Sequence, residues 1–561
     1  MRRVVSIYYL IFSLALVAKA QQAPLLELQK RGELVLSIDE TYLHQIPNVG
    51  SWSVDRIKNG KADVYVNRAQ YQTLLELNIP FIPLKAPSLL LEHTMAASIG
   101  EMALWDAYPT YQTYLDLMQK FAVDYPDLCT PDTIGYSVNG RLLLALKISD
   151  NPAIDETEPK VFYTSSIHGD ELTGYVLMLR LADYLLKNYS DTRIKNLVDQ
   201  LEIYINPLAN PDGAYKTGNH TVDGATRTNA NGVDLNRNFP DPAAGLQQDL
   251  YSGRQVETQL MMDYMQKRNF SLSMNHHGGA EVLNYPWDDS VINSETWQRH
   301  PDNDWFNLIC REFVDTVHVF DPSYMNDFNN GVTVGWEWYR ITGGRQDYVT
   351  YFLHGREITS ELSAVKLPDA SALSAYWEKT YRSFLNYLNQ AIYGIQGMVS
   401  DTAGNPLQAN ITIAGHDADN SEVYSQINGA FYRYLKAGNY LLQVSVEGYQ
   451  THEIAVEIND FEALPLNVVL EPLTGIEQKQ AAAFKLFPNP ATNYLTINYT
   501  LATNNPVANL KIYNLLGSLL HSQSVESPET SIDVSDYPSG IYFISLSQPG
   551  IKREIQKFIV E

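Results

Sequence analysis

The chain has 561 residues, which is too long for one ordinary core and predicts three or four domains. Its 40 basic and 64 acidic residues give a net charge of -24, which argues against binding to nucleic acid or anionic lipid. The only cysteines are Cys129 and Cys310, which excludes a disulfide framework and a thiolate metal cluster. Any metal site must therefore use histidine and carboxylate ligands.

The N-terminus has the layout of an export signal. Arg2 and Arg3 precede the apolar stretch 4–17, which leads into an A-x-A triplet that ends at Ala20. These are the parts of a secretory signal peptide, and we predict cleavage after Ala20. The stretch is too short to span a bilayer comfortably, and no later stretch is long enough. We expect an exported protein, secreted or attached to the cell surface, with no transmembrane segment.

The next two segments differ in size but both mix strand and helix patterns. Residues 21–104 hold short apolar runs around the helical-looking "RAQYQTLLELN" and predict a small α/β unit. In residues 105–393, apolar runs such as "VFYTSSI" alternate with amphipathic stretches such as "ELTGYVLMLRLADYLLKNY". This alternation predicts an α/β domain with a largely buried sheet, whose active residues lie at the carboxyl ends of strands.

The pattern changes after residue 393. Residues 394–473 contain short alternating strands separated by Gly, Asn and Asp, which predict a small antiparallel β-domain. The polar residues 474–483 look like a linker, and a second all-β module is expected over 484–561. No phosphate-binding loop, nucleophile elbow or dinucleotide glycine pattern occurs in the sequence.

A candidate metal site begins in "SIHGDELTG", where His168 and Glu171 follow the strand-like "VFYTS". Alone this H-x-x-E spacing is weak, because two polar residues in an exposed loop give the same pattern. A third ligand is available in "SMNHHGG", which contains His276 and His277. Side chains alternate along a strand, so at most one of these two histidines faces the site.

Further motifs follow in order along residues 105–392. They are H-x-x-E, NPDG, R-x8-N-R, H-G-G, Y-x3-G-G and T-x-E-L. With these spacings the segment resembles the zinc metallocarboxypeptidases, and most closely their regulatory branch, the carboxypeptidases N, E, M and D. The resemblance implies a carboxypeptidase-like fold, a mixed sheet flanked by helices. It also implies an exopeptidase that acts on peptide or protein C-termini and holds one Zn2+ per chain.

The family's metal and catalytic roles carry over to matching positions. His168, Glu171 and His277 match the zinc ligands, and His277 is favoured over its neighbour because "HGGAEVLNYPWD" aligns only when His277 leads. Glu361 in "TSEL" matches the general base, and Arg227 matches the arginine that polarises the scissile carbonyl. Two histidines and one glutamate leave zinc an open position for a water whose pKa drops to about 7.

The substrate-binding roles carry over in the same way. Asn236, Arg237 and Tyr339 match the group that holds the substrate's terminal carboxylate, a contact that only a chain end can make. Asp288, eleven residues after His277, matches the pocket aspartate that accepts Lys or Arg, and Gln346 matches the same branch. A solvated loop aspartate is the alternative for Asp288.

One pocket residue departs from the family pattern. Arg345 stands where the branch usually has methionine. If it turned inward it would neutralise the pocket aspartate and repel a basic side chain, so the sequence leaves basic specificity open on this point.

The flanking segments carry weaker or separate resemblances. Residues 21–104 faintly resemble the pro-regions of some family members, which cover the cleft, and an accessory domain is the alternative. Residues 394–473, through "GMVSDTAGNPLQANITI", resemble the transthyretin-like β-sandwich of the regulatory branch. Residues 484–561 resemble a type A sorting domain of the type IX secretion system, through "LFPNPATNYLTI", "IYNLLG", "SGIYFISL" and "QKFIV". This last resemblance implies the secretion machinery as a partner.

Two other functions stay open at this stage. A cell-wall peptide amidase could use the same scaffold, although a basic pocket would suit such an enzyme better than Asp288. A catalytically inactive surface binding protein is the other alternative, although inactive members usually lose a zinc ligand or the base, and all of these are present here.

Overall fold

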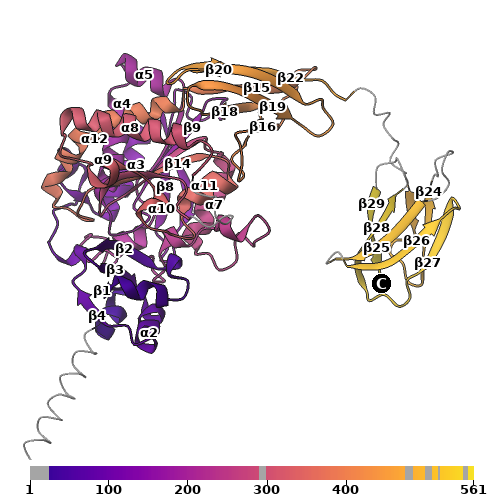
Figure 1. Ribbon diagram of the computed structural model, residues 1–561, viewed down its shortest axis with the longest axis horizontal. Helices are drawn as coiled ribbons and strands as arrows, with labels where there is room; N and C mark the ends of the chain where they lie inside the picture. The colour runs from indigo at the N-terminus through magenta and orange to yellow at the C-terminus, as the bar shows by residue number, and fades with distance from the viewer. Residues whose placement is uncertain (1–23, 290–298, 474–483, 500–507, 516–517, 548–553) are drawn as a thin grey trace, which may run out of the picture. The chain divides into compact units, whose positions relative to one another are not determined.

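The computed structural model describes residues 24–289, 299–473, 484–499, 508–515, 518–547 and 554–561 (Figure 1). The predicted signal peptide and the linker at 474–483 lie outside these residues. The chain divides into two compact units, one reaching to residue 470 and the other from residue 471 to the C-terminus, with 448–450 assigned to the second. Among the described residues no helix is both long and apolar enough to cross a membrane.

The first unit begins with a small α/β subdomain. Its four strands lie in the order β2-β3-β1-β4, and helix α2 follows β3 in the chain. A capping box starts this helix, because the Asn67 side chain accepts hydrogen bonds from the Ala69 and Gln70 amides while the Asn67 amide donates one to the Gln70 side-chain oxygen. The elements are β1 (Leu34–Asp39), β2 (Ser53–Lys58), β3 (Lys61–Val66), α2 (Arg68–Glu76) and β4 (Phe81–Leu84).

An eight-stranded mixed sheet forms the centre of the next subdomain, in the order β13-β12-β14-β11-β9-β10-β8-β7. The neighbouring strands β10, β9, β11 and β14 run parallel, so their carboxyl ends meet at one edge. The strands are β7 (Cys129–Tyr136), β8 (Leu142–Ile148), β9 (Lys160–Ser165), β10 (Glu202–Asn206), β11 (Leu272–His277), β12 (Glu281–Tyr285), β13 (Val332–Val334) and β14 (Arg356–Leu362).

Both faces of this sheet are covered, and the strand alternation decides which side chain enters which core. On β9, Val161 and Tyr163 pack into the large core with α3, α4, α5, α8 and α12, whereas Phe162 packs on the other face with α7 and α11. The helices are α3 (Tyr111–Asp124), α4 (Thr173–Lys187), α5 (Thr192–Val198), α7 (Val256–Arg268), α8 (Asn303–Phe320), α11 (Arg345–Phe352) and α12 (Leu373–Gln390). Cys129 and Cys310 are buried free thiols.

A β-module completes the first unit. One of its sheets has the order β17-β16-β19-β20 and is antiparallel, as predicted. The other contains β15, which pairs antiparallel with β18 but parallel with β21 and β22, so the expectation of a purely antiparallel module was wrong there. The strands are β15 (Gly394–Asp401), β16 (Asn410–Ile413), β17 (Val423–Tyr424), β18 (Ala430–Arg433), β19 (Gly438–Ser445), β20 (His452–Ile458), β21 (Ala463–Pro465) and β22 (Val468–Leu470).

A buried charge cluster joins this β-module to the α/β subdomain. The Asp302 carboxylate, at the start of α8, accepts from Arg356 Nε at 2.9 Å and from Arg433 NH1 and NH2 at 2.7 and 3.0 Å. His416 Nε2 of the β-module lies 2.8 Å from the same carboxylate. Asp302 is 2% exposed and both arginines are buried. These contacts use charge-assisted hydrogen bonds, which fix the geometry of the two subdomains more strictly than apolar contacts would.

The second unit is a separate β-fold with its own apolar core, which includes Leu495, Ile512 and Phe558. Its sheets have the orders β23-β24-β27 and β26-β25-β28-β29. The strands are β23 (Phe484–Phe487), β24 (Tyr494–Tyr499), β25 (Ala508–Asn514), β26 (Leu519–Val525), β27 (Glu529–Asp533), β28 (Gly540–Ser547) and β29 (Glu554–Val560). The predicted fold class, a mixed-sheet α/β domain followed by two β-modules, is confirmed.

We expect Asp302→Ala to destabilise the first unit strongly, because it leaves two buried arginines without their shared carboxylate. Removing one partner of a buried ion pair costs about 3–5 kcal/mol. Calorimetric melting of the full chain measures the effect. The control is Asp315→Ala, which removes an exposed carboxylate from the same helix and should leave the melting temperature within a degree or so. Equal melting temperatures for both variants would contradict the role given to the cluster.

Candidate active site

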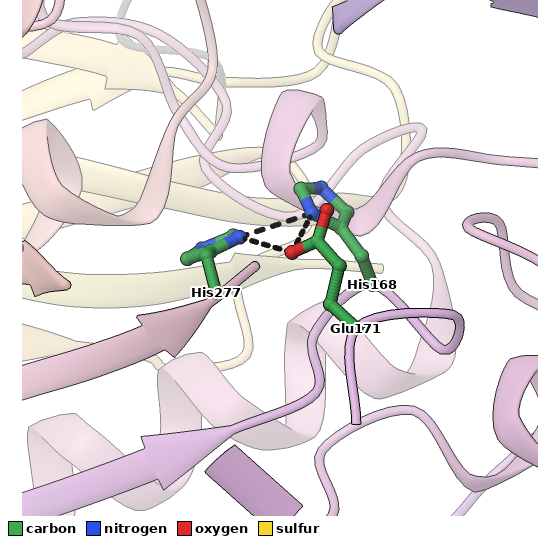
Figure 2. Close-up of side chains that lie close together, drawn as sticks. All are labelled: His168, Glu171 and His277. Atoms are coloured by element: carbon green, nitrogen blue, oxygen red, sulfur yellow. Dashed lines mark hydrogen bonds and ion pairs between the residues drawn. The ribbon is translucent and has the colours of Figure 1, made fainter. Parts of the chain in front are cut away.

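Three predicted metal ligands converge at the carboxyl edge of the sheet. His168 and Glu171 lie in the loop after β9, and His277 is the last residue of β11. Figure 2 shows the three side chains pointing toward one another, with Glu171 Oε2 3.0 Å from His168 Nδ1 and 2.8 Å from His277 Nδ1. The two Nδ1 atoms are 3.0 Å apart. Because β9 and β11 are parallel neighbours, their carboxyl ends bring His168 and Glu171 together with His277.

The donor set fits a zinc ion. Ligand atoms about 2.0–2.1 Å from a tetrahedral zinc lie about 3.3 Å apart, close to the spacing seen between these three atoms. The second ring nitrogen of His168 is 3.0 Å from Asp234 Oδ1, the carboxylate–histidine arrangement that fixes a metal ligand's ring. Burial lowers the pKa of His277 to about 4, so its ring is neutral, which is the form that binds metal.

His276 points elsewhere. Its Nδ1 lies 2.5 Å from Ser360 Oγ, and its ring stacks on Tyr163 at a centroid distance of 5.5 Å. The two neighbouring histidines therefore face opposite sides of β11, as strand alternation requires. Of the pair, the structure brings His277 to the other two ligands.

Arg227 and Glu361 both lie beside the three ligands. Arg227 NH1 is 3.0 Å from Glu171 Oε1, and Arg227 Nε is 2.9 Å from Asp234 Oδ2. Glu361 is opposite His277 in the register of β11 and β14, and its Oε2 is buried without a hydrogen-bond partner among the described residues. Burial, with the nearby Glu171 charge, raises the pKa of Glu361 well above its ordinary value. A carboxyl in this state readily accepts and returns a proton.

Arg237 offers a free donor in the same cleft. Its NH1 donates to the Asn236 carbonyl at 2.8 Å and its Nε to the Trp52 carbonyl at 3.3 Å, whereas its buried NH2 has no partner among the described residues. Asn236 and Tyr339 line the cleft with it. A buried guanidinium nitrogen without a partner is costly unless an anion fills the position, and a carboxylate fits it well.

Asp288 is a buried residue that also lines the cleft. The Gln346 side-chain amide donates to Asp288 Oδ1 at 2.9 Å, and a side chain at Gly335 would collide with the same oxygen, at 2.0 Å from the added carbon. Gly335 is thus required for the carboxylate to reach this place. Burial raises the pKa of Asp288 to about 7, and the Arg237 charge offsets part of this rise. The carboxylate is therefore set up for a cationic partner.

The unusual Arg345 does not enter this pocket. Its NH2 pairs with Glu357 Oε2 at 2.8 Å, its NH1 donates to Thr164, and its guanidinium lies over the Phe162 ring. Arg345 is completely buried, and its charge is balanced within the core behind the sheet. The repulsion of a basic substrate side chain, which the sequence left open, has no basis in this geometry.

Part of the N-terminal subdomain also lines the cleft. Asp55 is the extra residue of a β-bulge in β2, between the pairs Val54–Val64 and Arg56–Asp63. A bulge re-aims a side chain, and here Asp55 Oδ1 reaches Lys366 Nζ at 2.6 Å and Arg227 NH1 at 3.4 Å.

The same subdomain also holds the backbone of the loop that carries Arg227. Buried Glu33 accepts hydrogen bonds from the backbone amides of Arg227 and Thr228, both at 3.1 Å.

Sequence reasoning missed four of these residues: Glu33, Asp55, Asp234 and Lys366. Asp234 gave a signal, because it lies two residues before the Asn236-Arg237 pair, and Lys366 follows the "TSEL" motif closely. Glu33 and Asp55 gave none, because their partners are more than a hundred residues away in the chain.

Comparison with known proteins agrees with this geometry. Residues 114–383 match the family model described as zinc carboxypeptidase. The catalytic chain of mouse carboxypeptidase N is 32% identical over 388 residues, a match that covers 62% of this chain and 82% of the relative. The chain belongs to the zinc carboxypeptidase family.

Other matches concern the branch of the family and the domains that follow the catalytic one. Duck (Anas platyrhynchos) carboxypeptidase D is 34% identical over 363 residues, which covers 63% of this chain but only 26% of the relative, so the chain spans about a quarter of that protein. Residues 394–471 match a carboxypeptidase regulatory-like domain, and residues 485–561 match a secretion system C-terminal sorting domain. These matches confirm the resemblance to the regulatory branch and to a sorting domain.

A solved structure, carboxypeptidase A from Helicoverpa armigera, is also similar. It is 19% identical with a TM-score of 0.47, over 64% of this chain and 98% of that one.

We expect His277→Gln to lose bound zinc and His276→Gln to keep it, because only the first removes a nitrogen from the three-atom cluster. Metal content per chain after dialysis against trace zinc measures this directly. The His276 variant is the matched control, since it alters the adjacent histidine on the opposite face. Equal zinc content in both variants, or loss only in His276→Gln, would show that the cluster is assigned wrongly.

Proposed function

We propose that this family member is an exported zinc carboxypeptidase that removes C-terminal Lys or Arg from peptides and proteins. The observation that carries the proposal is the buried NH2 of Arg237, which has no hydrogen-bond partner in the part of the chain that the structure describes. It lies in one cleft with the three metal-binding side chains and Asp288. A free chain end supplies the carboxylate that this nitrogen needs, and a basic side chain supplies the cation that Asp288 needs.

The reaction follows from the groups around the cluster. One zinc ion held by His168, Glu171 and His277 would supply a Lewis acid and an activated water. Glu361, with its raised pKa, takes the water's proton and returns it to the leaving amine. Arg227 donates to the developing oxyanion, a contact whose loss typically costs ~10²–10³ in rate.

The terminal residue is positioned by two contacts of opposite charge. Asn236, Arg237 and Tyr339 hold its carboxylate, and Asp288, oriented by Gln346, holds its side chain. Because Arg345 pairs with Glu357 instead, its charge does not oppose a basic residue in this pocket. The geometry thus supports Lys or Arg over apolar residues.

The two alternative functions find no comparable support. A cell-wall amidase would need a pocket for acidic or neutral groups, whereas this one presents the Asp288 carboxylate. An inactive binding protein would not need Glu361 beside three intact ligands.

Export is part of the proposal. The C-terminal sorting-domain match supports passage through the type IX machinery to the cell surface or the medium.

The N-terminal subdomain also supports a further part of the proposal, that residues 21–104 keep the enzyme latent. The segment from Trp52 to Asp55 lies along the cleft, because the Trp52 carbonyl contacts Arg237, Ser53 Oγ donates to Asp234 at 2.5 Å, and Asp55 reaches Lys366. We call this subdomain the cover. The cover occupies positions that a peptide substrate would take.

We expect hydrolysis of acyl-dipeptides ending in Arg or Lys, abolished by a zinc chelator, with much slower hydrolysis of those ending in Phe or Glu. Asp288→Asn should lower kcat/KM for the Arg substrate about 30-fold or more and leave the Phe substrate nearly unchanged, since a buried charge partner is worth about 2–5 kcal/mol. The control Asp289→Asn alters the adjacent carboxylate, which pairs with Arg340 at 2.5 Å. A wild-type preference for Phe or Glu would contradict the pocket assignment.

We expect cleavage of the chain after β4, the last strand of the cover, to raise activity at least tenfold. A specific protease site inserted between the exposed residues Leu90 and Leu91 permits such a cut. Initial rates on an acyl-Ala-Arg substrate are compared before and after cutting. The control carries the same insertion between Ala403 and Gly404, in an exposed turn of the β-module. Unchanged activity after the first cut would show that the cover does not inhibit.

A further inference from the structure

We propose that Lys366 and Arg227 form an anion subsite, so that the enzyme favours peptides with Asp or Glu immediately before the residue it removes. The proposal rests on the proposed function and names the substrate class of the same site. It starts from the group that fills the position in this structure, the carboxylate of Asp55.

Asp55 marks the subsite because it meets two cations at once. Its Oδ1 lies 2.6 Å from Lys366 Nζ and 3.4 Å from Arg227 NH1. The Lys366 side chain is 4% exposed, and that of Asp55 is 20% exposed. A carboxylate at this distance from a largely buried ammonium forms a strong charge-assisted hydrogen bond.

The position relative to Arg237 identifies the substrate residue concerned. The cover crosses the cleft from the Trp52 carbonyl at Arg237 to Asp55 at Lys366. Three residue steps of an extended strand span roughly 10 Å. A substrate with its terminal carboxylate at Arg237 would have its scissile carbonyl near Arg227. The side chain of the residue before the scissile bond would then reach about as far from Arg237 as Asp55 does.

The charge balance shows why the subsite needs an anion. Among the described residues, Lys366 has ion pairs with Asp55 and with Glu171, whose Oε1 is 2.5 Å away. Glu171 is also bound by two histidines and by Arg227, so it is shared among several cations. When the cover leaves, Lys366 loses the Asp55 carboxylate, and its remaining ion-pair partner among the described residues is the shared Glu171. A buried cation without a full partner is costly.

One nearby acidic residue, Asp170, acts on the Lys366 charge from a distance, but among the described residues no ion pair joins the two. Asp170 accepts a hydrogen bond from Tyr65 of the cover at 3.1 Å. The Tyr65 ring lies 5.3 Å from Lys366 Nζ, so the cover also shields this ammonium from water. Departure of the cover thus frees a position beside Lys366 and Arg227 in which an acidic side chain can replace Asp55.

The chemistry ranks the residues that can precede the basic one. Asp or Glu restores the lost ion pair, Gln keeps the shape of Glu without its charge, and Lys brings a like charge near two cations. We expect kcat/KM to fall in the order Glu-Arg, Gln-Arg, Lys-Arg, with about tenfold between the first two.

The experiment uses the full chain cut between residues 90 and 91 and compares acyl-Glu-Arg with acyl-Gln-Arg. We expect a ratio of kcat/KM near ten at low salt that falls as salt rises, because the contact is electrostatic. Lys366→Gln should bring the ratio close to one, and Lys366→Arg should keep most of it. Lys187→Gln, which removes an exposed lysine of α4, is the matched control and should leave the ratio unchanged.

The outcomes separate this proposal from the function beneath it. Hydrolysis of both substrates at equal kcat/KM overturns the subsite and leaves the carboxypeptidase in place. If neither is hydrolysed, calorimetric binding of the two ligands to the zinc-loaded cut chain decides: tighter binding of the Glu ligand keeps the subsite while the proposed activity fails. Equal binding, or no binding of either, overturns the subsite as well.

Discussion

The buried carboxylate of Glu171 is the interaction on which this site depends. One of its oxygens meets His168, His277 and the Gly278 amide, and the other meets Arg227 and Lys366. Burial alone would raise its pKa, but the charges of His168 and Lys366 hold that pKa well below its ordinary value. The group stays ionised without water, which is what a metal ligand requires. His168, His277, Arg227 and Lys366 are all arranged around this one charge.

Such a site demands that each further charge be balanced locally. Arg227 is held by Asp234 and Glu171, Arg345 by Glu357, and Arg433 by Asp302. Buried ion pairs of this kind add little net stability compared with apolar packing, but they form in only one relative orientation of the two side chains. The sheet therefore brings the strand ends together, and the ion pairs fix the orientation of the side chains at those ends. The cover joins the same scheme, because Asp55 balances cations that the α/β subdomain leaves in excess.

Local pattern and motif order predicted most of the fold and the metal cluster. Strand alternation predicted that at most one of His276 and His277 faces the site, and the resemblance to the family favoured His277. The structure shows the two rings on opposite faces of β11. What could not be predicted depends on partners distant in the chain. The sequence around Arg345 left its direction open, since Glu357 and Thr164 come beside it only through the packing of α11 on the sheet. The bulge that turns Asp55 into the cleft is likewise a property of strand pairing and has no signature in the letters around it.

The direction in which the cover crosses the cleft has a consequence for the chain's own survival. In the proposed function a substrate would place its carboxyl end at Arg237, whereas the segment 52–55 has its amino end there and runs on along β2. The chain direction is thus the reverse of a substrate's, and the group that lies at the guanidinium is the carbonyl of an internal residue, Trp52. An exopeptidase can hold such a strand indefinitely without digesting it. With its cleft filled by its own backbone in this direction, the chain would be protected from the activity proposed for it.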